Sequence, residues 1–154
     1  MVNNLGWNKE GDLKFLIING PNLNLLGKRD TTIYGNDSLL DINNFIKNHF
    51  DSDMFEFFQS NHEGDIIDKI HQLNDDYNGI VMNPGAYAHY SYAIRDAIEA
   101  SSIPVVEVHL SNIYEREEFR RVSVTAPVCA DIVTGEGKNG YIKAVEIVKK
   151  AYSE

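Results

Sequence analysis

The sequence contains a single cysteine among its 154 residues. Because Cys129 alone cannot close an intramolecular disulfide or supply a cluster of thiolate ligands, a disulfide scaffold and a thiolate metal centre are excluded. No apolar run approaches the roughly 20 residues that a membrane span needs. Residues 1–14 also lack the apolar stretch of a signal peptide. We therefore expect a cytoplasmic protein that makes no membrane contact.

Positive charge is also scarce, with 14 Lys and Arg against 23 Asp and Glu and a net charge of −9. A polyanion would be repelled by this average field, so nucleic-acid binding is not expected. The length and an apolar content of 43% are ordinary for one globular domain. We expect that domain at residues 14–154, after a short extension at residues 1–13 in which Trp7 has no evident role.

The arginines fall in three short segments. Clustered guanidinium groups on an acidic protein favour a small anionic ligand held at a local site. A simpler explanation, that the later arginines only pair with the neighbouring Glu115, Glu117 and Glu118, stays open. The arginines are Arg29, Arg95, Arg116, Arg120 and Arg121.

Short apolar runs alternate with helical stripes along the chain. The runs predict strands at residues 13–19, 54–58, 79–83, 104–110 and 130–134. The alternation favours a parallel sheet with helices on both faces, and five strands fit the flavodoxin-like doubly wound order 2-1-3-4-5. A helix should begin at Ser38, which with Asp41 resembles a capping box. The expected inward-facing stripes are Leu39, Ile42, Ile46 and Phe50; Ile66, Ile67, Ile70, Leu73 and Tyr77; Tyr90, Ala93, Ile94, Ala97 and Ile98; and Tyr141, Ala144, Val145, Val148 and Tyr152.

The one sequence match to a cofactor-binding motif lies in the wrong place in the fold. Residues 135–140 match G-x-G-x-x-G, but a dinucleotide site carries that motif after the first strand, not the fifth. These glycines more simply permit a tight turn and close helix–strand contact. A phosphate-accepting domain would need acidic groups where Asn19 and Asn83 stand. The histidines show no metal-ligand spacing, so we expect no cofactor and no metal.

Three loops at the carboxyl ends of the expected strands carry the unusual chemistry, where ligands bind in open α/β sheets. The first, residues 19–35, has Arg29 five residues before Tyr34. The second covers residues 83–89. The third begins with Glu107 and His109, which point to one side of a strand. A carboxylate beside an imidazole orients it and keeps it protonated, although a buried structural histidine explains the pair equally well.

Four motifs in these regions, NGPNLNLLG…YG, QSNHEG, NPGAYAH…RDA and EVHLSN…REEFR, resemble the type II 3-dehydroquinate dehydratases of the shikimate pathway. The resemblance runs from about Lys14 to the end of the chain. It implies a hydro-lyase that converts 3-dehydroquinate to 3-dehydroshikimate by anti elimination through an enolate, without a metal or a Schiff base. It also implies a homododecamer built from trimers.

The resemblance implies roles for individual residues. Tyr34 would be the base that removes the C2 proton, and Arg29 would close over the substrate and favour the phenolate. Asn22 would hold a water at the enolate oxygen. His109 would protonate the departing C1 hydroxyl, oriented by Glu107.

The remaining implied contacts bind the substrate. Asn83, the backbone of Leu110 and Ser111 would receive its carboxylate. His89 and Arg120 would hold the ring hydroxyls, while Asp96 would reach the site of a neighbouring subunit.

If Tyr34 acts as a phenolate at neutral pH, its charged form must be stabilised by nearby groups. A free tyrosine has a pKa near 10, so roughly 4 kcal/mol of stabilisation is needed. One cation typically lowers a pKa by about 1–3 units. Arg29 alone is marginal, and we expect Arg116 to be a second cation near Tyr34.

The sequence departs from the family at three positions, and other functions remain open. Thr31 stands where the family usually has Pro, which bears on the stiffness of the loop that would close over the substrate. Cys129 and Asp131 stand where small residues or Gly are common, which bears on subunit packing or the local turn. The alternatives are a non-catalytic small-anion binding module on this fold, and another elimination or isomerisation of a cyclic hydroxy acid.

Overall fold

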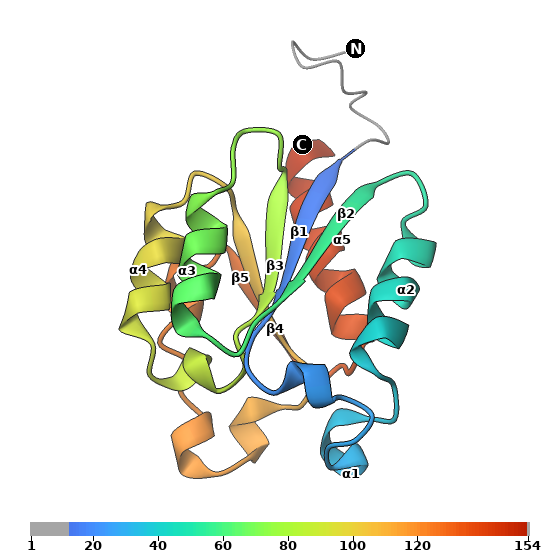
Figure 1. Ribbon diagram of the computed structural model, residues 1–154, viewed down its shortest axis with the longest axis vertical. Coiled ribbons are helices and arrows are strands. Elements are labelled where there is room, and N and C mark those ends of the chain that lie inside the picture. Colours follow the sequence, from blue (N-terminus) through green and yellow to red (C-terminus); the bar gives the residue numbers. More distant parts are fainter. Residues whose placement is uncertain (1–12, 154) are drawn as a thin grey trace.

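Five parallel strands cross the centre of the structure in the order β2-β1-β3-β4-β5 (Figure 1). The computed structural model describes residues 13–153, so Trp7 and residues 1–12 of the expected extension lie outside the described residues. The predicted flavodoxin-like order 2-1-3-4-5 is confirmed. The strands are β1 (Lys14–Asn19), β2 (Met54–Gln59), β3 (Gly79–Asn83), β4 (Val105–His109) and β5 (Asp131–Thr134).

Helices cover both faces of the sheet, as the apolar runs predicted. Side chains alternate along β1: Phe15 and Ile17 pack into the core beneath α2 (Leu39–His49) and α5 (Asn139–Ser153). Leu16 and Ile18 pack on the opposite face, beneath α3 (Glu63–His71) and α4 (Tyr92–Ala100). Fully burying one such side chain contributes about 1.5–3 kcal/mol. Figure 1 shows the two pairs of helices on either side of the strands.

The start of α2 confirms the predicted capping box. The Ser38 side chain accepts a hydrogen bond from the Asp41 backbone N–H, and the Asp41 carboxylate accepts one from the Ser38 N–H. Two backbone N–H groups that have no partner within the helix are thereby satisfied.

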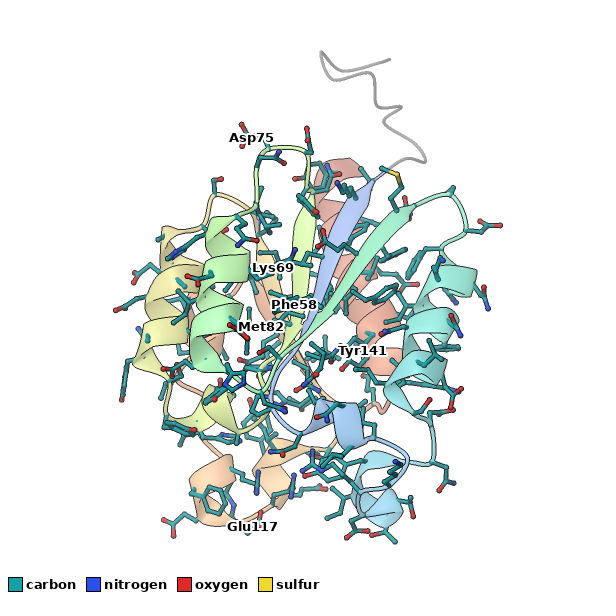
Figure 2. All side chains as sticks on the ribbon, in the orientation of Figure 1. Phe58, Lys69, Asp75, Met82, Glu117 and Tyr141 are labelled. Carbon is teal, nitrogen blue, oxygen red and sulfur yellow. The ribbon has the colours of Figure 1, made fainter. Side chains whose placement is uncertain are left out.

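One helix, α3, ends earlier than its apolar spacing predicted. α3 ends at His71, so Leu73 and Tyr77 lie in the following loop, where the Asn74 side chain accepts from the Asp76 N–H and forms a turn. Lys69 of α3 lies near Phe58 of β2, and Figure 2 labels both side chains. Tyr77 packs partly against the core and donates to Glu56.

Three residues expected to face inward are exposed. Ser91 caps α4 by accepting from the Ile94 N–H, so Tyr90 precedes the helix and is exposed. Ala93 lies on the solvent side of the same helix. Tyr152, in the last turn of α5, is also exposed and donates to the Asn78 carbonyl.

The loops after β1, β3 and β4 gather at the lower end of the sheet in Figure 1. β1 and β3 are neighbours, and their chains turn to opposite sides of the sheet, so strand order reverses between them. Gly20 donates from its N–H to the Asn83 carbonyl at 2.8 Å. A Cβ on Gly20 would lie 2.4 Å from the Pro84 carbonyl oxygen, so a larger residue would push the two loops apart.

Short helices lie in the connecting loops. α1 (Thr31–Tyr34) interrupts the long loop after β1, which the sequence predicted only as an irregular binding loop. The same loop also contains the 3-10 segment η1 (Leu23–Leu25), and four more lie in later loops of the described chain: η2 (Gly85–His89), η3 (Ile113–Glu115), η4 (Glu118–Arg120) and η5 (Ala126–Val128).

Candidate active site

One cavity at the carboxyl ends of the strands collects most of the predicted site residues. Three arginines and two histidines line it, which makes it cationic in a chain of net charge −9 and suits an anionic ligand. Glu107 and Asp96 are the predicted site residues that do not line it. Those that do are Asn22, Arg29, Tyr34, Asn83, His89, His109, Leu110, Ser111 and Arg120, together with the expected second cation, Arg116.

Two guanidinium groups meet at the hydroxyl of Tyr34. Arg29 donates from Nη2 at 3.0 Å and Arg116 donates from Nη1 at 2.9 Å. The Arg29 guanidinium also lies 4.0 Å from the centre of the Tyr34 ring. A phenolate oxygen only accepts hydrogen bonds, so two charged donors favour that form of the side chain.

α1 holds Tyr34 in place. Asp30 precedes the helix, and its carboxylate accepts from the Thr32 N–H and hydroxyl. These two bonds lower the pKa of Asp30. Thr31, where the sequence resemblance led us to expect proline, occupies the first helical position, at which proline is favoured. The Asp30 cap therefore starts the helix without a proline.

Two of the later arginines also pair with a neighbouring glutamate, as the simpler explanation of their clustering predicted. Glu117 lies 3.7 Å from Arg116 Nε and 2.9 Å from Arg120 Nε, so it bridges the two cations. Glu117 is exposed, and Figure 2 shows it at the lower edge of the molecule. Both arginines nevertheless line the cavity. Arg121 instead donates to the Arg116 carbonyl.

Glu107 lies directly behind His109. Its Oε2 atom is 3.2 Å from His109 Nε2, an ion-pair distance without the alignment of a hydrogen bond. Glu107 is 1% exposed, and its carboxylate accepts hydrogen bonds from the hydroxyls of Ser123 and Thr125. With Nε2 turned toward Glu107, Nδ1 is the His109 nitrogen left for a ligand in the cavity.

His89 stacks beside His109, with ring centroids 6.2 Å apart. Burial is the main influence on its ionisation and lowers the pKa of His89. Its Nδ1 lies 2.8 Å from the Val122 carbonyl, which can only accept, so Nδ1 carries the proton. In the neutral ring, Nε2 is then an acceptor suited to a ligand hydroxyl.

Asn22 has an unusual backbone. Its φ of 68° is the one positive value at a non-glycine residue in the described part of the chain. The Asn61 side chain accepts from the Asn22 N–H at 3.0 Å. Gln59 donates both to Asn61 Oδ1 and to the Gly20 carbonyl, which ties this turn to the end of β2.

A buried polar network fixes the amide of Asn83. Its Oδ1 accepts from the Gly85 N–H at 3.1 Å, and its Nδ2 donates to the Tyr141 hydroxyl at 3.3 Å. Tyr141 in turn donates to Asn19 Oδ1 at 2.5 Å. Figure 2 labels Tyr141 near the start of α5. The amide orientation is thereby set, and Asn83 Nδ2 has one hydrogen left for a ligand acceptor.

The glycine-rich segment after β5 shapes the loop after β4. Gly135 and Gly137 donate to the carbonyls of Ser111 and Leu110, and both glycines have positive φ. A Cβ on Gly140 would lie 3.0 Å from Val108, so this residue allows close helix–strand contact. The interpretation of these glycines as turn and packing residues is confirmed.

Asp96 is exposed on α4, away from the cavity, so its role stays a prediction. Within residues 13–153, no group of three or more His, Cys, Asp or Glu side chains is placed to hold a metal ion. In the same range, no helix is long and apolar enough to cross a membrane.

Comparison with known proteins identifies the family. The profile of the family described as "Dehydroquinase class II" matches residues 13–149. The chain belongs to the class II dehydroquinase family. A curated 3-dehydroquinate dehydratase of Thermotoga neapolitana is 55% identical over 144 residues, covering 92% of this chain and 98% of the relative. One of Clostridium botulinum is 58% identical over 135 residues, covering 86% and 92%.

Solved structures agree with this. The type II dehydroquinase of Butyrivibrio crossotus has a TM-score of 0.87 at 52% identity, covering 89% of this chain and 97% of that one. That of Propionibacterium acnes has a TM-score of 0.84 at 36% identity, covering 89% and 96%. The resemblance of the four sequence motifs to this family is confirmed.

Sequence reasoning missed four side chains of this chain that support the predicted site residues: Asn61, Ser123, Thr125 and Tyr141. Asn61 lies inside the QSNHEG motif, which carried the resemblance but had been given no role. Ser123 and Thr125 had no signal, because hydroxyl residues in a loop are ordinary. Tyr141 was expected only as an apolar core residue.

Proposed function

We propose that this chain is a hydro-lyase that converts 3-dehydroquinate to 3-dehydroshikimate and water. The curated relatives carry the name 3-dehydroquinate dehydratase, and the two type II structures cover most of the chain. The observation that carries the proposal is the pair of guanidinium groups on the Tyr34 hydroxyl, in one cavity with an imidazole backed by a buried carboxylate. A base and an acid in one pocket suit an elimination.

Tyr34 is the proposed base. As a phenolate stabilised by Arg29 and Arg116, it removes the C2 proton, and the electron pair of the C2–H bond forms an enolate with the C3 carbonyl. Asn22 lines the same cavity and holds a water that donates to the enolate oxygen. Tyr34 ends this step as a neutral phenol.

His109 is the proposed acid. When the enolate collapses, a C1–C2 double bond forms, the C1–O bond breaks, and His109 gives its Nδ1 proton to the departing hydroxyl, which leaves as water. Glu107 stabilises the imidazolium before this transfer. Base and acid act on opposite faces of the ring, which makes the elimination anti. Solvent returns a proton to His109 and takes one from Tyr34.

The other polar groups bind the substrate. Asn83 Nδ2, with one hydrogen free of the network, donates to the carboxylate, together with the backbone of Leu110 and Ser111. His89 accepts from a ring hydroxyl through Nε2, and Arg120 donates to another. No step uses a cofactor or a metal.

We also propose that the protein assembles as a dodecamer built from trimers, with Asp96 reaching a neighbouring site. Its exposure on α4 is compatible with a subunit contact. Light scattering after size exclusion should give about twelve times the chain mass of 17.4 kDa. A monomer with full activity would contradict both the assembly and the role of Asp96.

An absorbance assay tests the function. Purified protein is added to 3-dehydroquinate, and the ultraviolet absorbance of the conjugated product is followed with and without a chelator. A parallel reaction contains borohydride, which traps Schiff bases. We expect the same rate in all three reactions.

No turnover by the folded protein would instead support a small-anion binding module. The relatives named above carry the name of an enzyme, so they give that alternative no support. Turnover of a different cyclic hydroxy acid in preference to 3-dehydroquinate would overturn the substrate assignment and leave the Tyr34 and His109 chemistry in place.

A further inference from the structure

Two hydroxyl groups hold the carboxylate behind the proposed acid. Ser123 donates to Glu107 Oε2 at 2.7 Å, and Thr125 donates to Glu107 Oε1. The same Oε2 atom faces His109 Nε2 at 3.2 Å. Glu107 is 1% exposed and Thr125 is fully buried, so water does not compete for these oxygens. Each carboxylate oxygen therefore has one hydroxyl donor, and one oxygen also meets the imidazole.

The number of hydrogens available favours one charge state. The Ser123 and Thr125 oxygens are 3.2 Å apart, and each hydroxyl has a single hydrogen. With both hydrogens directed at Glu107, the carboxylate accepts at both oxygens, and its ionised form is the stronger acceptor. A protonated Glu107 could donate to His109 Nε2, but the oxygen that carries the proton would accept from its hydroxyl partner more weakly. The hydroxyl pair thus favours a proton on His109 over a proton on Glu107.

We propose that Thr125, assisted by Ser123, is a positioning residue for the His109 acid, because its hydroxyl keeps the Glu107 carboxylate ionised and turned toward the imidazole. The consequence for turnover rests on the function proposed above. The hydrogen-bond arrangement itself does not depend on the identity of the substrate. Thr125 touches no cavity surface and acts only through Glu107.

Other ionisable groups surround the pair. His89 stacks on His109 from η2, and Arg116 and Arg120 line the cavity from the segment after β4. Tyr34 and Arg29 line it from the loop after β1. Cys129 approaches from the end of η5; burial first, and then the charge of Glu107, raise the pKa of its thiol to about 12, so it stays neutral in the assay range. None of these groups is altered in a Thr125 variant.

The test compares Thr125→Val with Thr125→Ser. Valine keeps the shape but removes the hydroxyl, so the buried carboxylate loses a donor and competes with His109 for the proton. We expect Thr125→Val to lower kcat by about tenfold, to change KM less than kcat, and to move the alkaline limb of the kcat profile to higher pH, because the Glu107–His109 pair then holds its shared proton more tightly but mostly on Glu107. Thr125→Ser should restore the position of that limb. Ser101→Ala, which removes a side-chain hydrogen bond away from the site, should leave the profile unchanged.

A purely structural role predicts a different result. Thr125→Val and Thr125→Ser would then both lower thermal stability, and neither would move the alkaline limb. That result, or equal shifts with valine and serine, would overturn the proposal. If Thr125→Val does not fold, Ser123→Ala removes the other donor and should move the limb in the same direction.

Imidazole NMR separates this inference from the proposed function. In Thr125→Val, labelled His109 should carry a smaller share of the proton at neutral pH than in the wild type, whatever the substrate is. If the wild type does not turn over 3-dehydroquinate, the proposed function is refuted, but the His109 titration still tests the positioning role of Thr125. Unchanged His109 titration beside normal wild-type turnover would refute the positioning role alone.

Discussion

Arg116 donates to the Tyr34 hydroxyl at 2.9 Å across 82 residues of sequence. Arg29 donates to the same oxygen from only five residues away. The near cation belongs to the loop after β1 and the distant one to the segment after β4, so the pair forms only when both loops reach one end of the sheet. The phenol is then held by two charged donors.

Removing the distant cation should shift the pH dependence of turnover. In Arg116→Ala the phenolate loses one of two guanidinium partners, so a higher pH is needed to form it. We expect the acidic limb of the kcat profile to move upward and kcat at neutral pH to fall about tenfold or more. Lys143→Ala is the control, because it removes an exposed cation that pairs with Glu136 and does not line the cavity. An unmoved acidic limb would exclude Arg116 as the second cation.

Removing only the Tyr34 hydroxyl tests the base. Tyr34→Phe keeps the ring that the Arg29 guanidinium covers but loses the atom that would take the C2 proton. Turnover should fall by at least about a thousandfold, while thermal unfolding changes little because the side chain is only partly buried. Binding of a substrate analogue, followed by calorimetry, should persist. Substantial remaining activity would mean that another group removes the proton.

The buried network around Tyr141 should matter for both stability and binding. Tyr141→Phe leaves Asn19 Oδ1 without its donor and releases Asn83 Nδ2, so we expect a loss of about 1–3 kcal/mol in the free energy of unfolding. KM should rise because the Asn83 amide is less well oriented. Tyr152→Phe, which removes an exposed hydroxyl bonded to Asn78, should stay within about 0.5 kcal/mol. Denaturant unfolding of both variants makes the comparison.

Proline at position 31 should stabilise the loop. Thr31 is the first residue of α1, where the fixed φ of proline is compatible, and Thr31→Pro should add about 0.4–1 kcal/mol to the free energy of unfolding. Thr32→Pro is the opposing control, since it removes the N–H that donates to Asp30 at 3.0 Å. Thermal unfolding should therefore rank Thr31→Pro above the wild type and Thr32→Pro below it. The reverse order would mean that α1 does not begin at Thr31.

Cys129 should resist alkylation in the folded protein. Burial, followed by the nearby Glu107 charge, raises the pKa of its thiol to about 12, so very little thiolate is present at pH 8. Because the thiolate is the nucleophile, iodoacetamide should react far more slowly with native protein than with protein unfolded in guanidinium chloride. Mass spectrometry of timed samples measures both rates. Equal rates would contradict the raised pKa.

Periodicity predicted the strands because it reports burial directly, and the alternation of five strands with helices fitted the flavodoxin-like order. β1 is buried on both faces, as its continuous apolar run predicted. The same signal overestimated the helices, since apolar spacing continued through Leu73 and Tyr77 after the Asn74 turn had ended α3. It also placed Tyr90 and Tyr152 in the core. Both side chains are exposed instead, because a tyrosine hydroxyl is more easily satisfied at the surface.

The sequence by itself determined the sheet, the three loops that meet at its carboxyl edge and the family, because apolar patterns and long motifs are properties of the linear chain. It also indicated Arg116, from the requirement for a second cation. Only the tertiary structure decided which atoms touch: both arginines on one phenol, Glu107 behind His109, and Ser123 and Thr125 on that carboxylate. The physical reason is the distance along the chain over which each interaction acts. Local patterns determine elements through backbone geometry and burial, whereas hydrogen bonds between distant loops depend on positions that only the packed fold fixes.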